Sequence, residues 1–173
     1  MSDLSKIALL VIDVDGTMTD GSIYYDATGN ELKKFNTKDA AGLFAAKCAN
    51  IKTMVLTGRR SAAVERRMKE LKVDYLHQGI TDKSSFLHAF MEQNNLAKEC
   101  VGYIGDDLND FSPMKLCGFV ACPADACEEI RQISDYIAES IGGHGAVREC
   151  ITYLLKSRGE WDIAIATAYG FGT

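Results

Sequence analysis

The sequence contains no apolar run that approaches the ~20 residues needed to span a membrane. The residues before its first apolar run also lack the features of a secretory signal peptide. We therefore expect no membrane association and a cytoplasmic location. Basic residues are not in excess, because 19 Lys and Arg stand against 24 Asp and Glu. Since a nucleic-acid backbone requires a basic face, we expect no nucleic-acid partner, although a small anionic substrate is compatible with this charge.

Cysteine and histidine do not form a recognisable metal or disulfide pattern. The six cysteines include no Cys-x-x-Cys pair and stand among apolar neighbours. We expect them to be reduced and mostly buried as small apolar residues. The three histidines are scattered and do not predict a zinc site, and His88 is expected on the surface of a helix.

Strand-like and helix-like segments alternate along the chain, with no internal repeat and no linker. Short apolar runs mark the expected strands, at 7–12, 51–56, 73–76, 100–104, 119–122 and 136–138. Amphipathic segments mark the expected helices, at 38–50, 61–72, 82–95, 111–117, 125–133 and 146–157. Thr37 and Ser61 are expected to cap two of them. The alternation predicts one α/β domain over 1–173, a doubly wound, Rossmann-like parallel sheet with helices on both faces.

Two segments lie outside this alternation. Two β-prone runs around Ala-Thr-Gly-Asn predict a protruding β-hairpin within 21–36. Nothing local buries its apolar residues, which are Ile23, Tyr24, Tyr25, Leu32 and Phe35. Because an isolated hairpin is only marginally stable, we expect it to pack against another surface, such as a second copy of itself. The segment 158–173 is interpreted as an apolar tail rich in Ala and Gly.

Two carboxylates follow the first apolar run directly. Asp13 and Asp15 come after the run 7–12, whose unbroken apolar character is typical of a central parallel strand. Because residues i and i+2 of an extended chain point the same way, both carboxyls can project from one edge of the sheet. Such close carboxylates repel each other unless a cation or a proton relieves the repulsion. An Asp helix cap followed by an Asp turn is the alternative interpretation.

Polar residues also stand at the ends of two later strands, namely Thr57, and Asp106-Asp107 with Asp110, and Lys83 begins the helix that follows the third strand. Ligands of doubly wound sheets bind outside the carboxyl ends of the strands, so these residues are expected to form one site with the first two carboxylates. Each piece also has a simpler interpretation. Thr57-Gly58 can be a turn, Lys83 a surface lysine, and the acidic group a helix start favoured by the helix dipole.

Together these residues match the needs of phosphate monoester cleavage. Asp13 is the candidate nucleophile, which would form an aspartyl-phosphate, and Asp15 is the candidate acid and base. Mg²⁺ prefers oxygen ligands, and the candidates are the side chains of Asp13 and Asp106 with the Asp15 backbone carbonyl. Thr57 and Lys83 would bind the phosphoryl group and offset its charge.

Asp-Val-Asp-Gly-Thr resembles the first motif of the haloacid dehalogenase (HAD) superfamily, which consists mostly of magnesium-dependent phosphohydrolases. The resemblance covers roughly 7–155 and includes all four superfamily motifs in order. It implies that Asp13 is the nucleophile, Asp15 the acid and base, Thr57 the phosphate-binding residue, Lys83 the lysine of the third motif and Asp106 a metal ligand. Asp107 and Asp110 are then supporting acidic residues.

The chain resembles most closely the capless phosphatases of 3-deoxy-D-manno-octulosonate 8-phosphate (KDO 8-phosphate), which act in lipopolysaccharide biosynthesis. The similar stretches are Asp-Gly-x-x-Thr-Asp-Gly, Lys-x-Phe-Asn-Thr-Lys-Asp, Thr-Gly-Arg, Gln-Gly-x-x-Asp-Lys, Gly-Asp-Asp-x-Asn-Asp and Gly-Gly-x-Gly-Ala-Val-Arg-Glu. Between the motifs there is room for the hairpin, helices and one strand, but not for a cap domain. The resemblance implies a Mg²⁺-dependent phosphatase acting on a sugar-acid phosphate.

A capless site must be enclosed in some other way. In the family that the chain resembles, the hairpins assemble a homotetramer and a neighbouring subunit completes each active site. Arg59 and the pair Arg66-Arg67 are candidates for the substrate carboxylate, because arginine binds carboxylates bidentately; a solvated helix face is the alternative. Gly58 and Gly79 are expected to line the substrate site. The Gly142 to Gly145 loop and the tail are candidates to close over the substrate.

Three other functions are compatible with parts of this pattern. A phosphatase for a nine-carbon sugar acid 9-phosphate uses the same chemistry, and Arg59 after Thr57-Gly58 favours the eight-carbon substrate by resemblance alone. A phospho-accepting receiver domain usually carries its phosphorylated Asp after the third strand, where this sequence has His77-Gln78-Gly79. A non-catalytic assembly module would not require the full set of motifs.

Overall fold

The computed structural model describes residues 3–170 of the chain. Its centre is a parallel sheet of six strands in the order β5-β4-β1-β6-β7-β8. The strands are β1 (Leu9–Ile12), β4 (Lys52–Thr57), β5 (Tyr75–Gln78), β6 (Val101–Ile104), β7 (Phe119–Cys122) and β8 (Tyr136–Ile137). The sheet confirms the predicted doubly wound α/β fold.

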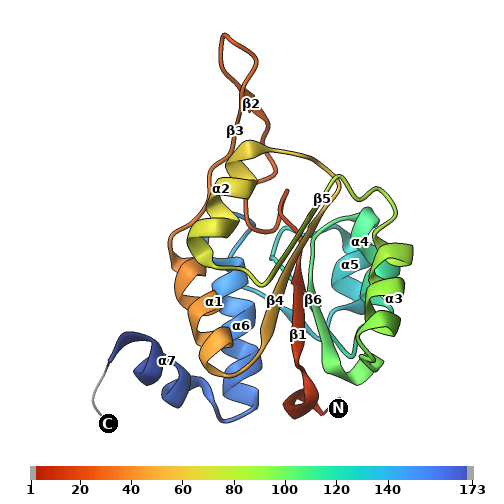
Figure 1. Ribbon diagram of the computed structural model, residues 1–173, viewed down its shortest axis with the longest axis vertical. Coiled ribbons are helices and arrows are strands. Elements are labelled where there is room, and N and C mark those ends of the chain that lie inside the picture. The colour runs from red at the N-terminus through yellow and green to blue at the C-terminus, as the bar shows by residue number, and fades with distance from the viewer. Residues whose placement is uncertain (1–2, 171–173) are drawn as a thin grey trace.

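Helices cover both faces of this sheet (Figure 1). One face carries α1 (Lys38–Cys48), α2 (Ala62–Leu71) and α6 (Ala146–Ser157), with α7 (Trp161–Tyr169) lying beside α1. The other face carries α3 (Lys83–Gln93), α4 (Leu108–Met114) and α5 (Glu128–Ile133). Two short 3₁₀ turns, Leu4–Lys6 and Lys98–Cys100, precede β1 and β6.

The central strand β1 explains why the core has two halves. Its side chains alternate between the faces of the sheet, so that Leu10 and Ile12 join the α1, α2 and α6 side while Leu9 and Val11 join the α3, α4 and α5 side. All four side chains are buried. An apolar run without alternation is what a strand covered on both faces requires.

The predicted hairpin protrudes from the sheet (Figure 1) and consists of β2 (Tyr24–Tyr25) and β3 (Glu31–Leu32). The Asp26 carboxylate closes its turn by accepting hydrogen bonds from Thr28 and Asn30. Four of the five apolar side chains named above are exposed, namely Ile23, Tyr24, Tyr25 and Leu32. Phe35 differs, because it is partly buried against the core on the α1 side.

Strand β5 begins two residues later than predicted. Lys72 ends α2 in the left-handed region with φ of 54°, and Val73 donates its backbone N–H to Met68. Both residues therefore belong to the helix end rather than to the strand. His77 and Gln78 accordingly lie within β5.

Thr37 and Ser61 stand at the N-cap positions of α1 and α2, as predicted, but neither side chain makes a capping hydrogen bond. The Ser61 hydroxyl makes no capping bond, and the Ser61 N–H instead donates to the Gln78 side chain at 2.9 Å. The Thr37 side chain does not cap α1 either, since the Asn36 side chain accepts from the Lys38 N–H at 2.9 Å.

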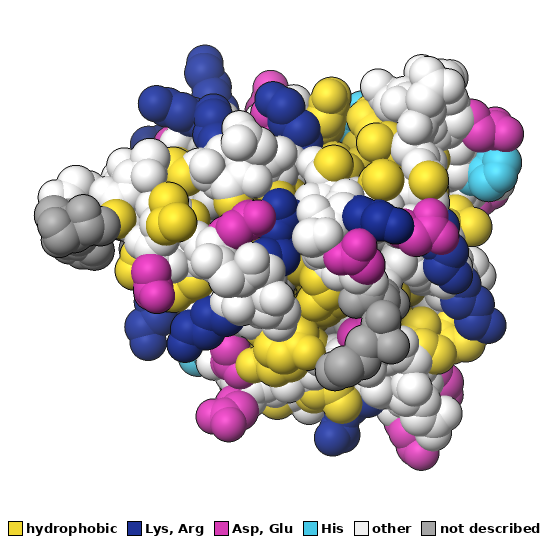
Figure 2. Space-filling model, turned by 90° about the horizontal axis from the view of Figure 1, so that it is seen from below, with side chains coloured by type: hydrophobic (Ala, Val, Ile, Leu, Met, Phe, Trp, Pro, Cys, Tyr) yellow, Lys and Arg dark blue, Asp and Glu magenta, His cyan; other side chains and the backbone are white. Residues whose placement is uncertain are grey.

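The segment predicted to be an apolar tail forms α7 as far as Tyr169. Trp161 is buried at its start, with Arg148 over the ring at 4.6 Å from the centroid. This helix lies at the end of the molecule opposite the hairpin (Figure 1). Viewed from that end, acidic, basic and apolar side chains are interspersed (Figure 2). Among residues 3–170 no helix is long and apolar enough to cross a membrane.

Candidate active site

The carboxyl ends of the three central strands bring the sequence motifs together. In the parallel register, Ile12 of β1 lies opposite Val55 of β4 and Ile104 of β6. The segments that follow these three strands therefore leave the sheet at the same edge. Asp13 stays attached to that edge, because its backbone N–H donates to the Ile104 carbonyl at 2.9 Å.

Lys83 lies between two buried carboxylates. Its Nζ is 2.6 Å from Asp13 Oδ1 and 2.7 Å from Asp110 Oδ1. The lysine is the first residue of α3, where the Asp82 side chain caps the helix by accepting from the Ser85 N–H. Burial acts to lower the pKa of Lys83, but the charges of Asp13 and Asp110 outweigh it and raise the pKa. The ammonium therefore stays charged, and the simpler interpretation of Lys83 as a surface lysine is wrong.

Asp110 holds the other groups in place. Its Oδ1 also accepts from the Tyr103 hydroxyl at 2.8 Å, and its Oδ2 accepts from the Asp106 N–H at 3.1 Å. Both carboxylate oxygens are thus engaged by the protein itself. This arrangement suits the supporting role that the sequence predicted for Asp110.

Asp106 lies at the end of β6 and contacts the loop after β1. The Thr17 hydroxyl donates to Asp106 Oδ1 at 2.6 Å. A Cβ on Gly16 would lie 2.0 Å from Asp106 Oδ2, and Gly16 has φ of 95°, so only glycine fits at this position. Burial raises the pKa of Asp106 to about 7, although the Thr17 hydrogen bond opposes the rise.

Residues Asp13, Asp106 and Asp110 form a cluster that fits a hard divalent cation. Each offers a carboxylate oxygen, and these atoms lie within 4.8 Å of one another. Burial raises the pKa of Asp13 well above its ordinary value, the charge of Asp110 adds to the rise, and Lys83 offsets it only in part. Three carboxylates facing one ammonium leave two negative charges uncompensated when all are ionised. An oxygen-only donor set with this charge suits Mg²⁺.

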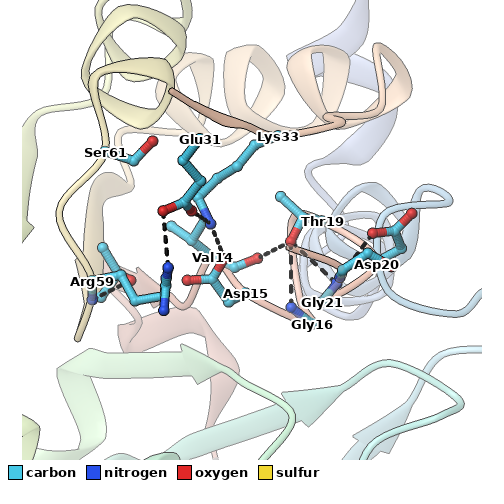
Figure 3. Close-up of polar contacts among 12 residues, drawn as sticks. Val14, Asp15, Gly16, Thr19, Asp20, Gly21, Glu31, Lys33, Arg59 and Ser61 are labelled. Carbon is cyan, nitrogen blue, oxygen red and sulfur yellow. Dashed lines mark hydrogen bonds and ion pairs between the residues drawn. The ribbon is translucent and has the colours of Figure 1, made fainter. Parts of the chain in front are cut away.

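Asp15 does not contact the carboxylate cluster in this structure, but meets the hairpin instead. The Lys33 ammonium donates to Asp15 Oδ1 and lies 2.7 Å from Glu31 Oε1. Arg59 Nη2 in turn lies 2.9 Å from Glu31 Oε2 (Figure 3). Arg59 is thereby linked to Asp15 through Glu31 and Lys33, and its partner is a side chain of the same subunit.

The residues expected to bind the phosphoryl group lie in two adjoining loops. Thr57 is buried at the end of β4, and its hydroxyl accepts from the Arg59 N–H at 3.4 Å. The Gly79 N–H donates to the Arg59 carbonyl at 3.1 Å, which ties the loop after β5 to the loop containing Gly58. The Ile80 N–H donates to the Thr57 carbonyl at 3.1 Å.

Three of the predicted polar residues point to other partners. Arg67 Nη1 lies 3.3 Å from Glu70, and the exposed Arg66 pairs with the same glutamate. Asp107 is exposed and caps α4 by accepting from the Leu108 N–H at 2.8 Å. The structure therefore shows no contact of Arg67 or Asp107 with the carboxylate cluster among the residues that it describes.

The glycine loop after β8 is part of the framework of the site. A Cβ on Gly142 would lie 1.9 Å from the Gly16 carbonyl oxygen, so the two loops touch through their backbones. The Gly143 N–H donates to the Thr17 carbonyl at 3.2 Å, and the Asn36 side chain donates to the Gly143 carbonyl. The loop supports the turn that carries the first motif.

Sequence reasoning missed four residues of the site: Thr17, Glu31, Lys33 and Tyr103. A signal existed for three of them. Glu31 and Lys33 stand two apart on an expected strand and so share a side of it, and a Tyr within a buried strand needs a hydrogen-bond partner. Thr17 lies in the first motif, but nothing in the spacing shows that it reaches Asp106.

Comparison with known proteins identifies relatives by sequence. No family model matches the chain. The chain is 38% identical over 164 residues to 3-deoxy-D-manno-octulosonate 8-phosphate phosphatase of Salmonella typhi, covering 95% of this chain and 87% of that protein. It is 33% identical over 168 residues to the protein of the same name from Haemophilus influenzae, covering 97% and 93%.

Solved structures agree with these relatives. The phosphatase of the same name from Moraxella catarrhalis, in complex with magnesium ion, phosphate ion and KDO, has a TM-score of 0.90 and 40% identity over 96% of each chain. The cobalt-bound phosphatase from Haemophilus influenzae has a TM-score of 0.87 and 32% identity, covering 92% of this chain and 94% of that one.

Proposed function

The chain belongs to the family of 3-deoxy-D-manno-octulosonate 8-phosphate phosphatases of the HAD superfamily, and from this membership we propose that it hydrolyses that sugar-acid phosphate with the aid of Mg²⁺. The observation that carries the proposal is the cluster of Asp13, Asp106 and Asp110, in which Lys83 binds the carboxylates of Asp13 and Asp110. A phosphatase that forms an aspartyl-phosphate needs a carboxylate nucleophile and positive charge at one point, and this cluster supplies both.

Asp13 is the nucleophile in this proposal. One oxygen of its carboxylate attacks phosphorus, the bond to the sugar oxygen breaks, and an aspartyl-phosphate results. Lys83 orients the carboxylate through its 2.6 Å contact and offsets the charge on the phosphoryl oxygens. Thr57, at the end of β4, and Gly58, directly after it, supply hydrogen-bond donors to the same group, while Gly79 holds their loop in place through its bond to the Arg59 carbonyl.

Asp15 moves the protons. It donates one to the sugar oxygen as the ester bond breaks, and it then accepts one from the water that hydrolyses the aspartyl-phosphate. Asp13 and Asp106 would hold the metal through side-chain oxygens, and Asp15 through its backbone carbonyl. When bound, Mg²⁺ supplies positive charge to the phosphoryl oxygens and relieves the repulsion among the carboxylates.

The sugar acid carries a carboxylate that the phosphate site does not bind. We assign its recognition to Arg59 and Arg67, because arginine pairs with carboxylates bidentately. Arg59 stands beside Asp15 through Glu31 and Lys33. Arg67 pairs with Glu70 and not with the carboxylate cluster of its own subunit. It would therefore act in the site of a neighbouring subunit.

Assembly is part of the same proposal. The hairpin exposes 48% of Tyr24, 63% of Tyr25 and 53% of Leu32, which is apolar surface suited to contact with other copies. We propose a homotetramer built through the hairpins, with each subunit completing the site of a neighbour. A cytoplasmic location is supported by the six free cysteines.

Phosphate release tests the proposed function directly. The substrates are KDO 8-phosphate, a nine-carbon sugar acid 9-phosphate and 4-nitrophenyl phosphate, each with Mg²⁺ and with excess chelator. We expect repeated turnover that depends on Mg²⁺ and is fastest on the eight-carbon substrate. Faster turnover of the nine-carbon substrate would contradict the substrate assignment. Release limited to one phosphate per subunit would identify a phospho-acceptor instead of an enzyme.

A further inference from the structure

Lys33 has a buried side chain on a hairpin whose residues are mostly exposed. Its side chain is only 1% exposed, while the flanking residues Leu32 and Lys34 are exposed. A lysine is seldom buried in this way unless its charge is paired, because removing an ammonium from water is costly. Its position therefore calls for an explanation beyond the folding of the hairpin.

The partners of Lys33 link the hairpin to the acid and base of the site. The ammonium contacts the carboxylates of Asp15 and Glu31, and Glu31 also binds Arg59 (Figure 3). The four side chains form a row of alternating charge that runs from the turn after β1, through the hairpin, to the loop after β4. Burial acts to lower the pKa of Lys33, but its bonds to Asp15 and Glu31 outweigh this and raise the pKa.

We propose that Lys33 is a positioning residue that holds the Asp15 carboxylate in its working orientation, and that Glu31 and Arg59 fix Lys33 in place. This inference rests on the proposed function, in which Asp15 transfers protons. The hairpin then serves the active site of its own subunit as well as assembly. Lys33 itself transfers no proton, and the bonds that form and break at phosphorus are those given above.

Sugar esters and nitrophenyl esters of phosphate differ in their need for the proton of Asp15. A sugar oxygen is a poor leaving group and needs the proton of Asp15 as its bond to phosphorus breaks. A 4-nitrophenolate is stable as an anion and leaves without one. Loss of the Asp15 orientation should therefore lower kcat/KM selectively for alkyl esters. This ratio covers the steps up to release of the alcohol and not the later hydrolysis of the aspartyl-phosphate, which uses Asp15 for both esters. Damage to the fold or to the phosphate site should lower kcat/KM equally for both esters.

The test compares Lys33→Met with Lys34→Met. Lys34 is the neighbouring lysine, exposed and paired only loosely with Asp20 at 3.8 Å, so it is the matched control. General acid catalysis contributes about 10²- to 10⁴-fold, so Lys33→Met should lower kcat/KM on KDO 8-phosphate by about 10- to 100-fold. Its kcat/KM on 4-nitrophenyl phosphate should change by less than about threefold. Lys34→Met should match the wild type on both.

A second variant keeps the test decisive if Lys33→Met does not fold. Glu31→Gln breaks the row of charges from the other side, and it should produce the same selective loss to a smaller degree. Hydrogen–deuterium exchange gives a readout that does not depend on activity. The hairpin amides should exchange faster in Lys33→Met and Glu31→Gln than in Lys34→Met, because the row of charges ties the hairpin to the body of the domain.

Equal losses on both esters, or no loss on either, would overturn the inference while leaving the proposed function intact. A wild-type protein that releases no phosphate from either ester in the presence of Mg²⁺ would instead contradict the proposed function. The two failures are therefore distinguishable in one set of assays.

Discussion

At the scale of single residues, the energetic problem of this protein is buried negative charge. Asp13, Asp39 and Asp110 are each at most 3% exposed, and Asp106 is partly buried beside them. A buried carboxylate must be paired, hydrogen-bonded or protonated. Asp110 is fully hydrogen-bonded, whereas the environments of the other three raise their pKa. Of these three, Asp13 and Asp106 face the proposed metal position, whereas Asp39 does not.

Asp13→Asn should abolish most of the activity. The substitution keeps the shape of the side chain but removes the attacking anion and one charge of the metal site. We expect kcat to fall by at least about 1000-fold, which corresponds to about 4 kcal/mol of barrier. A variant that kept more than a tenth of the wild-type rate would exclude an aspartyl-phosphate at this position.

Asp106→Ala should weaken Mg²⁺ binding without unfolding the protein, because the residue stands at a strand end rather than in the apolar core. Titration calorimetry with Mg²⁺ alone measures the affinity, and circular dichroism verifies the fold. The matched control is Asp107→Ala, since Asp107 is the exposed neighbour that caps α4. Unchanged Mg²⁺ affinity and activity in Asp106→Ala would show that Asp106 is not a ligand.

Asp39→Asn should change how stability depends on pH. Burial raises the pKa of Asp39 to about 6, against an ordinary value of 3.8, despite its hydrogen bond from the Arg148 N–H and the charge of Arg67. The folded state thus binds the proton more tightly than the unfolded state. The resulting stabilisation is complete below pH ~4 and is lost as the pH rises through about 6.

The Asp39→Asn variant lacks this loss of stability with rising pH. Its free energy of unfolding relative to the wild type should therefore rise between pH 4 and 7, by at most about 3 kcal/mol. Urea unfolding at several pH values measures the difference. A difference that is constant with pH would show that Asp39 does not titrate in this range.

At the scale of elements, the sequence predicted best where an apolar run has clear limits. Phe119–Cys122 and Ala146–Ser157 were predicted with their observed bounds. The start of β5 was missed because the left-handed Lys72 lets the end of α2 take in Val73, which the apolar pattern alone does not reveal. The helix α7 was missed because it is apolar almost all round, so no stripe with a helical period marks it.

The candidate site could likewise be predicted only in part from the sequence. Residues at strand ends were brought to one edge by the parallel register, which the alternation of elements already implied. Contacts made by the hairpin could not be predicted, because strands of two residues do not determine where the hairpin folds back. The row from Asp15 to Arg59 therefore required the structure.

The first turn of α3 offers a test of how an element positions a site residue. Asp82 caps the helix that begins with Lys83. Asp82→Ala should lower Tm by about 2–4 °C for a domain of this size, because the cap is lost. Asp82→Asn keeps a capping oxygen and serves as the control, with a Tm close to that of the wild type. Equal losses in both variants would assign the effect to charge rather than to the cap.

At the scale of the whole molecule, the active site must be enclosed without a cap domain. The segment between β1 and α1 contains the hairpin rather than a cap domain, and the described part of the C-terminal segment packs beside α1 at the opposite end. Phosphoryl transfer benefits from a site shielded from water. Apolar side chains of the hairpin, such as Tyr24 and Leu32, are also exposed in the described part of the subunit. Contact between copies answers both needs at once.

The arginines of α2 test this shared site. Arg67→Ala should raise the KM for KDO 8-phosphate much more than that for 4-nitrophenyl phosphate, because only the sugar acid carries a carboxylate. Arg66→Ala is the matched control, since both arginines pair with Glu70 but the Arg66 side chain is 83% exposed and that of Arg67 only 21%. An equal rise in KM on both substrates would show that Arg67 acts on the structure or on the phosphate, and not on the carboxylate.

Light scattering completes the test, with a homotetramer as the expected species. Cyclic symmetry lets the same hairpin contact repeat until the ring closes, so intermediate species should be scarce. Replacing Tyr24 and Leu32 by Ser removes apolar contact area on the hairpin strands and should shift the protein towards the monomer. Activity should fall in parallel, because each site loses the neighbour that completes it. A monomer as active as the wild type would refute the shared site, and the effect of Arg67→Ala would then have to arise within one subunit.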